Sequence, residues 1–501
     1  MLNLLEELKD KNIYISVKDN NLVIDTTEDI EESLIKRIRL YKEEIISYIL
    51  KHNSNSITKH TATGKDHPVS DAQKRLWLQS LTEEGSKSYH INYPIELPST
   101  YNLEIVRLAV LQLIKNFEIF RTVFNLNNKG EIKQSVLEED NTGFDVEIID
   151  LKDESDAIKV IENAVQDLNS LAFDLTKGSL LRCKIFELKD KIVVYFIFHH
   201  IIIDGVSLNI IKQNILNYYF AILHSEEIST PKLQYLDYTY WKLEAVNNGS
   251  YNVAQRYWVE LLSKKIPTID LPSYVKRPSV KTFNSYSLKT VISSGLTQKL
   301  EAFAKDNKGT LNVSLLSAIY VILNKYTSEN DITLGTFTSG RNHPSLNEMP
   351  GLFVNTIVLN TVLEPQKDTS TDIFRKVKES FTKAFTYQDY PFDLLIEDLQ
   401  LSPDVSRNSL FDITVVFQDY LDNELNEIYN DEIVEIGFTK RAFDINFEFI
   451  NKGSFLEMIT TFNVDIYNKE TIIGFISHFK EVLHQFVFSS EIPLKSLDYI
   501  S

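Results

Sequence analysis

One strand-to-helix passage constrains this chain more than any other part of its sequence. An apolar run at residues 192–198 predicts a buried strand, and an amphipathic run at residues 206–224 predicts a helix. Between them stands His-His-Ile-Ile-Ile-Asp-Gly, residues 199–205, so a strand delivers two imidazoles to a loop. A histidine can take a proton near neutral pH, and a carboxylate four residues further on can brace the turn. The arrangement therefore suits acyl transfer.

Length, charge and cysteine content limit the architecture and the partners. The chain has 501 residues, too many for one hydrophobic core, so we expect several lobes. Its net charge of −18 is diffuse, which argues against nucleic acid or an anionic membrane as the main partner. The single cysteine, Cys183, excludes a disulfide framework and a thiolate metal cluster. The sequence has neither a signal peptide nor an apolar run of ~20 residues, so it predicts a soluble cytoplasmic protein.

Residues 1–54 predict a small separate unit of helix, hairpin and helix. Two β-prone runs at residues 13–17 and 22–25 flank Lys-Asp-Asn-Asn, which is a hairpin signal. Leu4, Leu5 and Leu8 mark a short helix before the hairpin. The apolar face of the helix after it comprises Leu34, Ile38, Tyr41, Ile45, Tyr48 and Ile49.

The edge of this hairpin is a candidate docking site, because an uncovered edge can accept a peptide strand. The docking candidates are Ile13, Tyr14, Ile15, Val17, Lys18, Leu22, Val23 and Ile24. Residues 55–66 are polar and predict a flexible linker after the unit.

Seven short motifs follow the linker in a fixed order. They lie at residues 70–78, 118–124, 199–205, 235–238, 351–356, 388–393 and 406–411. Each is weak alone, but together they make residues 67–501 resemble a nonribosomal peptide synthetase condensation domain. In the second motif the family usually has Arg-His ahead of the glutamate, where this chain has Asn116 and Phe117. A charge and an imidazole are therefore expected to be missing near the floor of the active site.

The resemblance implies an α+β fold with two lobes, residues 67–230 and 231–501. Each lobe would be similar to chloramphenicol acetyltransferase, and together they would form a V around a central tunnel. Donor and acceptor would enter from opposite ends, carried on the phosphopantetheine of partner carrier proteins, with no cofactor bound by the chain itself. Residues 1–54 separately resemble TubC-like N-terminal docking domains, which recognise the C-terminal tail of an upstream synthetase.

The loop residues have distinct expected roles. His200 is expected to act as the base that takes the proton of the amine, or to orient the amine. His199 is expected to pack behind His200 or to orient the loop. Asp204 could orient His200 as in a triad, but a buried ion pair with Arg121 is the preferred interpretation. Gly205 is expected to allow close backbone approach of substrate or to adopt an unusual φ, and the alternative is a plain turn glycine before a helix.

Three polar residues stand in otherwise apolar motifs: Asn355, Gln388 and Asp389. We expect them to line the tunnel or to bind a bridging strand. No metal site is expected at the histidine pair. The β-branched residues 201–203 disfavour the helix that would align ligands four residues apart, and no other His or Cys cluster completes a ligand shell.

The leading functional hypothesis is an amide-forming acyltransferase that uses a peptidyl or aminoacyl thioester on an upstream carrier. Because the chain ends at Ser501, directly after the condensation region, we expect a terminal step that releases a peptide amide to a free amine. This resembles the stand-alone terminal condensation proteins of rhabdopeptide-type pathways. The alternatives are a fragment of a larger synthetase with a carrier-bound aminoacyl acceptor, an epimerase, or a non-catalytic recruitment platform.

Overall fold

A computed structural model describes most of the chain, and the chain divides into two compact units, Met1–Thr61 and Ala62–Ser501. The described residues are 14–18, 21–25, 32–42, 45, 56–60, 66–264, 266–273, 275–401, 404–419 and 432–497. Within these residues, no helix has the length and apolar character needed to cross a membrane.

The first unit contains the predicted hairpin. Strands β1 (Tyr14–Lys18) and β2 (Asn21–Asp25) pair antiparallel, and helix α2 (Glu32–Leu40) follows. The predicted apolar face of the helix is confirmed at three buried residues: Leu34, Ile38 and Ile45. Other residues of these predictions lie outside the described ones: Leu4, Leu5, Leu8, Ile13, Tyr48 and Ile49.

The first half of the second unit, here called the N-lobe (residues 66–224), holds two sheets. Its strands are β3 (His67–Pro68), β4 (His90–Pro98), β5 (Thr122–Leu126), β6 (Ile132–Val136), β7 (Val146–Asp150), β8 (Leu181–Glu187) and β9 (Lys191–His199). Its helices are α4 (Asp71–Gln79), α5 (Glu83–Lys87), α6 (Leu103–Asn116), η1 (Glu118–Arg121), η2 (Glu139–Asn141), α7 (Ala157–Ser170), η3 (His200–Ile202) and α8 (Gly205–His224). The strand orders are β4-β9-β8-β7 and β3-β6-β5.

Local sequence signals explain several N-lobe elements. The predicted strand at 192–198 is β9, and the predicted helix at 206–224 is α8. Ser70 begins α4 with a capping box, and Asn102 caps α6 through its side chain. Cys183 lies in β8 and is buried, and this burial raises the pKa of its thiol.

The second half of the unit, here called the C-lobe (residues 284–497), is built on one large sheet. Its strands are β10 (Asn284–Ile292), β11 (Asp331–Thr338), β12 (Asn355–Val362), β13 (Ile413–Asp419), β14 (Val434–Lys440), β15 (Ile445–Asn451) and β16 (Leu456–Asn463). Its helices are α11 (Ser294–Asp306), α12 (Leu311–Thr327), η4 (Pro344–Leu346), α13 (Ser370–Thr386), α14 (Phe392–Leu399), α15 (Lys469–Phe488) and η5 (Leu494–Ser496). The strand order is β12-β11-β13-β15-β16-β10-β14.

Helix α12 forms the centre of the C-lobe core. Every residue from Val313 to Asn324 is buried, because the helix contacts α11, α13, α15 and strand β11. Helices α9 (Tyr235–Asn247) and α10 (Asn252–Leu262) connect the lobes. The fold is therefore α+β, as the sequence predicts.

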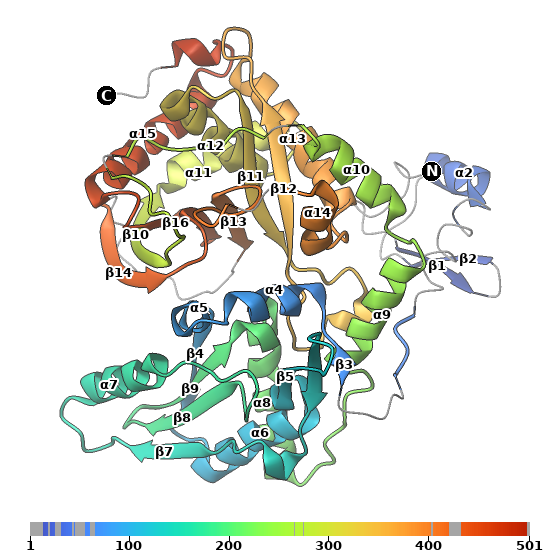
Figure 1. The fold of residues 1–501 in the computed structure, drawn as a ribbon, viewed down its shortest axis with the longest axis vertical. Helices are drawn as coiled ribbons and strands as arrows, with labels where there is room; N and C mark the ends of the chain where they lie inside the picture. The colour runs from blue at the N-terminus through green and yellow to red at the C-terminus, as the bar shows by residue number, and fades with distance from the viewer. Residues whose placement is uncertain are drawn as a thin grey trace. The chain divides into compact units, whose positions relative to one another are not determined.

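Helix α4 lies between the two lobes (Figure 1). It contacts η3 of the N-lobe and α14 of the C-lobe. The loop that carries the histidine pair is therefore close to the seam between the lobes.

Candidate active site

Strand β9 delivers both histidines to the point where the strand becomes a loop. His199 is the last residue of β9 and is fully buried, and His200 begins η3. The Nδ1 atom of His199 accepts the backbone N–H of Ile201 at 3.2 Å. Its Nε2 therefore carries the proton and donates to Ser80 Oγ at 3.2 Å. These contacts orient the turn that presents His200.

His200 presents a nitrogen with a free lone pair. Its Nδ1 lies 2.6 Å from the carbonyl oxygen of Ile203, and because a carbonyl can only accept, Nδ1 carries the proton. Nε2 is therefore unprotonated, and none of the described residues hydrogen-bonds to it. Burial lowers the pKa of His200, although the charge of Asp204 partly opposes this. The imidazole is neutral near neutral pH, which is the state a general base requires.

Asp204 joins the histidine loop to the C-lobe. It caps α8 and has no exposed surface. Its carboxylate accepts the N–H and O–H of Ser207 at 2.8 and 2.7 Å and the backbone N–H of Phe353 at 3.1 Å. It also pairs with Arg341 at 3.1 Å, and the Arg341 guanidinium lies 4.1 Å above the Phe353 ring. Because the ring proton of His200 is bonded to a carbonyl, Asp204 does not orient His200 directly, and the triad interpretation is wrong.

The predicted ion pair between Asp204 and Arg121 is also wrong. The guanidinium of Arg121 donates to backbone carbonyls of Leu137, Ile114 and Lys115. The last two belong to the final turn of α6, where carbonyls lack helical partners, so Arg121 closes that helix.

Sequence reasoning missed Arg341, the actual partner of Asp204. It lies 137 residues further along the chain, outside all seven motifs. A local pattern cannot reveal a partner at that distance, and only the need of a buried carboxylate for some cation was visible.

Gly205 is the first residue of α8, and its φ is not in the left-handed region. The expectation of an unusual φ is therefore wrong. A Cβ atom built on Gly205 would meet nothing within 4 Å, and the residue lines the cavity described next. The backbone at this point is thus open to a ligand.

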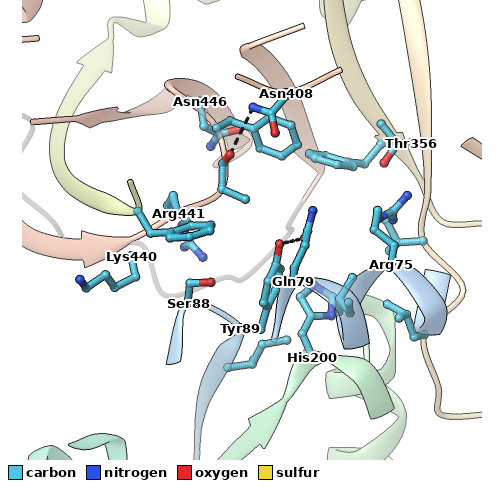
Figure 2. A pocket seen from close by; sticks show the side chains of 18 of the residues that line it. Arg75, Gln79, Ser88, Tyr89, His200, Thr356, Asn408, Lys440, Arg441 and Asn446 are labelled. Atoms are coloured by element: carbon cyan, nitrogen blue, oxygen red, sulfur yellow. Dashed lines mark hydrogen bonds between the residues drawn. The ribbon is translucent and has the colours of Figure 1, made fainter. Parts of the chain in front are cut away.

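A cavity of about 1490 Å³ lies between the lobes and includes His200 in its wall. It is larger than the roughly 300–1,000 Å³ of a typical small-molecule pocket, so it has room for two reactants. In Figure 2, His200, Tyr89 and Gln79 lie together, and Asn408 and Asn446 lie across the cavity from them.

Basic side chains outnumber acidic ones in this cavity, in contrast to the charge of the whole chain. The basic lining residues are Lys74, Arg75, Lys87, Lys281, Arg407, Lys440 and Arg441. The acidic lining residues are Glu84, Asp393, Glu397 and Glu448. Most of these cations are paired with carboxylates, among them Lys74 with Glu397, Arg75 with Asp393 and Lys440 with Glu84, so the lining carries little unbalanced charge.

Tyr89 and Gln79 form a hydrogen-bonded pair beside His200 that the sequence did not reveal. The Tyr89 hydroxyl donates to Gln79 Oε1 (Figure 2). The rings of Tyr89 and His200 lie 6.5 Å apart between centroids, at an interplanar angle of 66°. The backbone N–H of His200 also donates to the carbonyl of Tyr89 at 2.8 Å. Gln79 directly follows the first motif, and that position is the only sequence signal that could have marked it.

Asn355, Gln388 and Asp389 are not among the residues that line this cavity, so the first of their two expected roles is not met here, and the binding of a bridging strand stays a prediction. The Asn355 amide donates to the backbone carbonyls of Gln388 and Tyr390 at 2.7 and 2.8 Å. The carboxylate of Asp389 accepts from Asn342. These residues hold the loop before α14 against the start of β12.

The departure at Asn116 and Phe117 lies away from the cavity as well. Both residues are buried, and neither lines the cavity wall. The Asn116 amide donates to the hydroxyl of Tyr218 in α8 at 3.0 Å. The change therefore affects the packing of α6 on α8 and not the active-site floor.

The side chains of His199, His200 and Asp204 all have protein partners, as described above. Throughout the described parts of the chain, no three His, Cys, Asp or Glu residues are grouped so that they could hold a metal ion.

Comparison with known proteins gives one family match and several relatives. Residues 64–501 match the family model described as "Condensation domain". The chain is 30% identical over 440 residues to gramicidin S synthase 2 of Aneurinibacillus migulanus, covering 87% of this chain and 10% of the relative. It is 31% identical over 420 residues to bacitracin synthase 3 of Bacillus licheniformis, covering 83% and 6%. The chain thus spans only a small part of the length of these relatives.

Solved structures share the fold. The complex of the X-domain and OxyB from teicoplanin biosynthesis matches with a TM-score of 0.76 and 18% identity, over 89% of this chain and 98% of that chain. A structure described as the basis for condensation domain-mediated chain release from the enacyloxin polyketide synthase matches with a TM-score of 0.68 and 16% identity. It covers 98% of this chain and 96% of that chain. At these identities the likeness establishes the fold.

Proposed function

Because the chain belongs to the condensation domain family, whose members are acyltransferases that form amide bonds between carrier-bound substrates, we propose that His200 is the base of such a reaction here. The observation that carries this proposal is the unprotonated Nε2 of His200 in the wall of a cavity large enough for two reactants.

The reaction balances with the groups in the cavity. The amine nitrogen attacks the thioester carbonyl, and a tetrahedral oxyanion forms. His200 Nε2 takes the proton that the nitrogen loses. The carbon–sulfur bond then breaks, and the proton passes from His200 to the leaving thiolate, so the base is restored.

For the acceptor, we infer a free amine, so that the step releases a peptide amide. Support comes from the likeness, over 98% of this chain, to the structure whose description names chain release by a condensation domain. The second candidate is a carrier-bound aminoacyl acceptor. It is favoured by the curated relatives, of which this chain spans only a small part.

We infer that residues 1–54 dock the C-terminal tail of an upstream synthetase. Support comes from the β1–β2 hairpin, which is a two-stranded sheet among the described residues, since a peptide strand can add to a sheet edge. Basic residues on α2, among them the exposed Arg37 and Arg39, would select an acidic tail.

One experiment separates the two acceptors. A carrier protein loaded with a peptidyl donor is incubated with the enzyme and either a panel of free amines or an aminoacyl-loaded second carrier, and products are read by mass spectrometry. Amide products from free amines alone support chain release, and products only on the second carrier support the other candidate. His200→Ala should lower either rate by at least ~10²-fold, the least expected for a lost base. A variant that folds normally and keeps more than about a tenth of the activity would contradict the role of His200.

A further inference from the structure

We propose that the Tyr89 hydroxyl is the hydrogen-bond donor for the oxyanion that forms at the thioester carbonyl, and that Gln79 holds this donor until substrate binds. The proposal rests on the acyl transfer proposed above. It assigns a role to two residues outside the histidine loop.

The position of Tyr89 suits this role. Its ring stands 6.5 Å from the His200 ring, and its backbone carbonyl is bonded to the His200 N–H, so the two side chains keep a fixed relation. Tyr89, Gln79 and His200 all line the same cavity (Figure 2). A carbonyl carbon attacked beside His200 thus lies within the same part of the cavity as the phenol. A donor in place before the reaction stabilises the developing charge without reorganisation.

The protonation state of Tyr89 supports a donor role. Burial raises the pKa of Tyr89 to about 12, although the nearby charge of Arg75 opposes this. The phenol therefore keeps its proton in the neutral range, where His200 is unprotonated. It can donate a hydrogen bond to an oxyanion, but it does not give up its proton.

Gln79 can release the donor by a rotation about one bond. Without substrate, the Tyr89 hydroxyl donates to Gln79 Oε1, while Gln79 Nε2 has no partner among the described residues. A half-turn of the terminal amide exchanges the two atoms, and the torsion involved is soft. Nε2 then donates to the phenol oxygen, and the phenol O–H is free to donate to the substrate.

The first test removes only the hydroxyl. With N-acetylleucyl, N-acetylvalyl or N-acetylphenylalanyl thioesters of N-acetylcysteamine and benzylamine, Tyr89→Phe should lower kcat by ~10²-fold with little change in KM. The acid limb of its pH profile should match that of the wild type, since His200 is untouched. The matched control is Tyr219→Phe in α8, whose hydroxyl accepts the backbone N–H of Asn102 at 2.9 Å, and its rate should be unchanged because neither residue lines the cavity. The proposal would be overturned if Tyr89→Phe lowered kcat by less than about 3-fold, or if the fall of its rate at low pH were shifted from that of the wild type.

The second test uses Gln79 to separate a donor from a structural tether. Gln79→Glu keeps the shape but can only accept, so it should hold the phenol proton and lower kcat strongly. Gln79→Met cannot hold the proton and should lower kcat less. If Gln79 only tethers Tyr89, the order of the two variants reverses, and the proposal is wrong. Rates are compared on the plateau above the acid limb, because the new carboxylate would raise the pKa of His200.

Hydrolysis of the same thioesters, measured without an amine, distinguishes failure of this proposal from failure of the proposed function. It passes through the same kind of oxyanion. If no amide forms but hydrolysis depends on Tyr89, the amide-forming function fails and the donor role stands. If amide forms equally well without the hydroxyl, the donor role fails and the function stands.

Discussion

At the residue scale, one backbone carbonyl determines the chemistry of His200. The sequence revealed the histidine pair, but it could not show which ring nitrogen carries the proton. That depends on the contact of Nδ1 with the Ile203 carbonyl, which the turn η3 creates. The same contact leaves Nε2 for the substrate and explains why Asp204 is not needed as an orienting acid.

The lowered pKa of His200 predicts the pH dependence of the reaction. A base must be unprotonated, so kcat/KM, calculated on the unprotonated amine, should fall as pH drops through a pKa below the ordinary value of 6.5 and should be flat above that value. The sign follows from burial, which disfavours the charged imidazolium. Rates with a small soluble thioester, measured from about pH 4.5 to 8.5, would test this, and an acid limb centred above about 7 would contradict it.

At the element scale, the contact between Asp204 and Arg341 fixes the N-lobe loop to the segment before β12. The sequence correctly indicated a buried ion pair for Asp204 but gave the wrong arginine. β9 and α8 could be predicted because the apolar pattern of each is local. The ion pair that joins the two lobes is formed by Asp204 and Arg341, which are 137 positions apart, and no local sequence pattern predicts a contact at that distance.

Double-mutant cycles should distinguish the two arginines. Asp204→Asn combined with Arg341→Gln should show a coupling energy of about 1–3 kcal/mol in the free energy of unfolding, because the pair is buried and in contact. Asp204→Asn alone should cost about 3–5 kcal/mol, since Arg341 keeps a buried charge without its partner.

The same cycle with Arg121→Gln should show a coupling energy near zero, within about 0.5 kcal/mol, because among the described residues that side chain bonds to the carbonyls of Ile114, Leu137 and Lys115 and not to Asp204. Chemical denaturation of the single and double variants would measure both values. A larger coupling to Arg121 than to Arg341 would contradict the structure.

At the scale of the whole molecule, the chain separates recognition from chemistry. The cavity, His200 and Tyr89 all lie in the second unit, while the hairpin lies in the first. The motifs predicted a condensation domain from residue 67 onward, and the family match spans residues 64–501. They could not predict which motif residues face the cavity. Asn355 donates to the backbone carbonyl of Gln388, and Asp389 accepts from Asn342, so both side chains are used in contacts between loops.

Deleting residues 1–54 should weaken the reaction of carrier-bound donor and spare the reaction of a small soluble thioester. The reason is that docking raises the local concentration of the carrier but supplies no group to the cavity. Steady-state rates with both donors would test this. Equal loss with both would mean that the first unit supports the fold of the second.

The buried position of Cys183 has a practical consequence for studying how the N-lobe unfolds. As the sole cysteine, held in β8 with a raised pKa, it should remain inert to maleimides while the N-lobe is folded. A second cysteine at the exposed position Lys59 could then carry a single fluorophore without prior removal of the native thiol. The slow rate at which a maleimide labels Cys183 would then measure the rate at which the N-lobe opens, so the native thiol can report on unfolding.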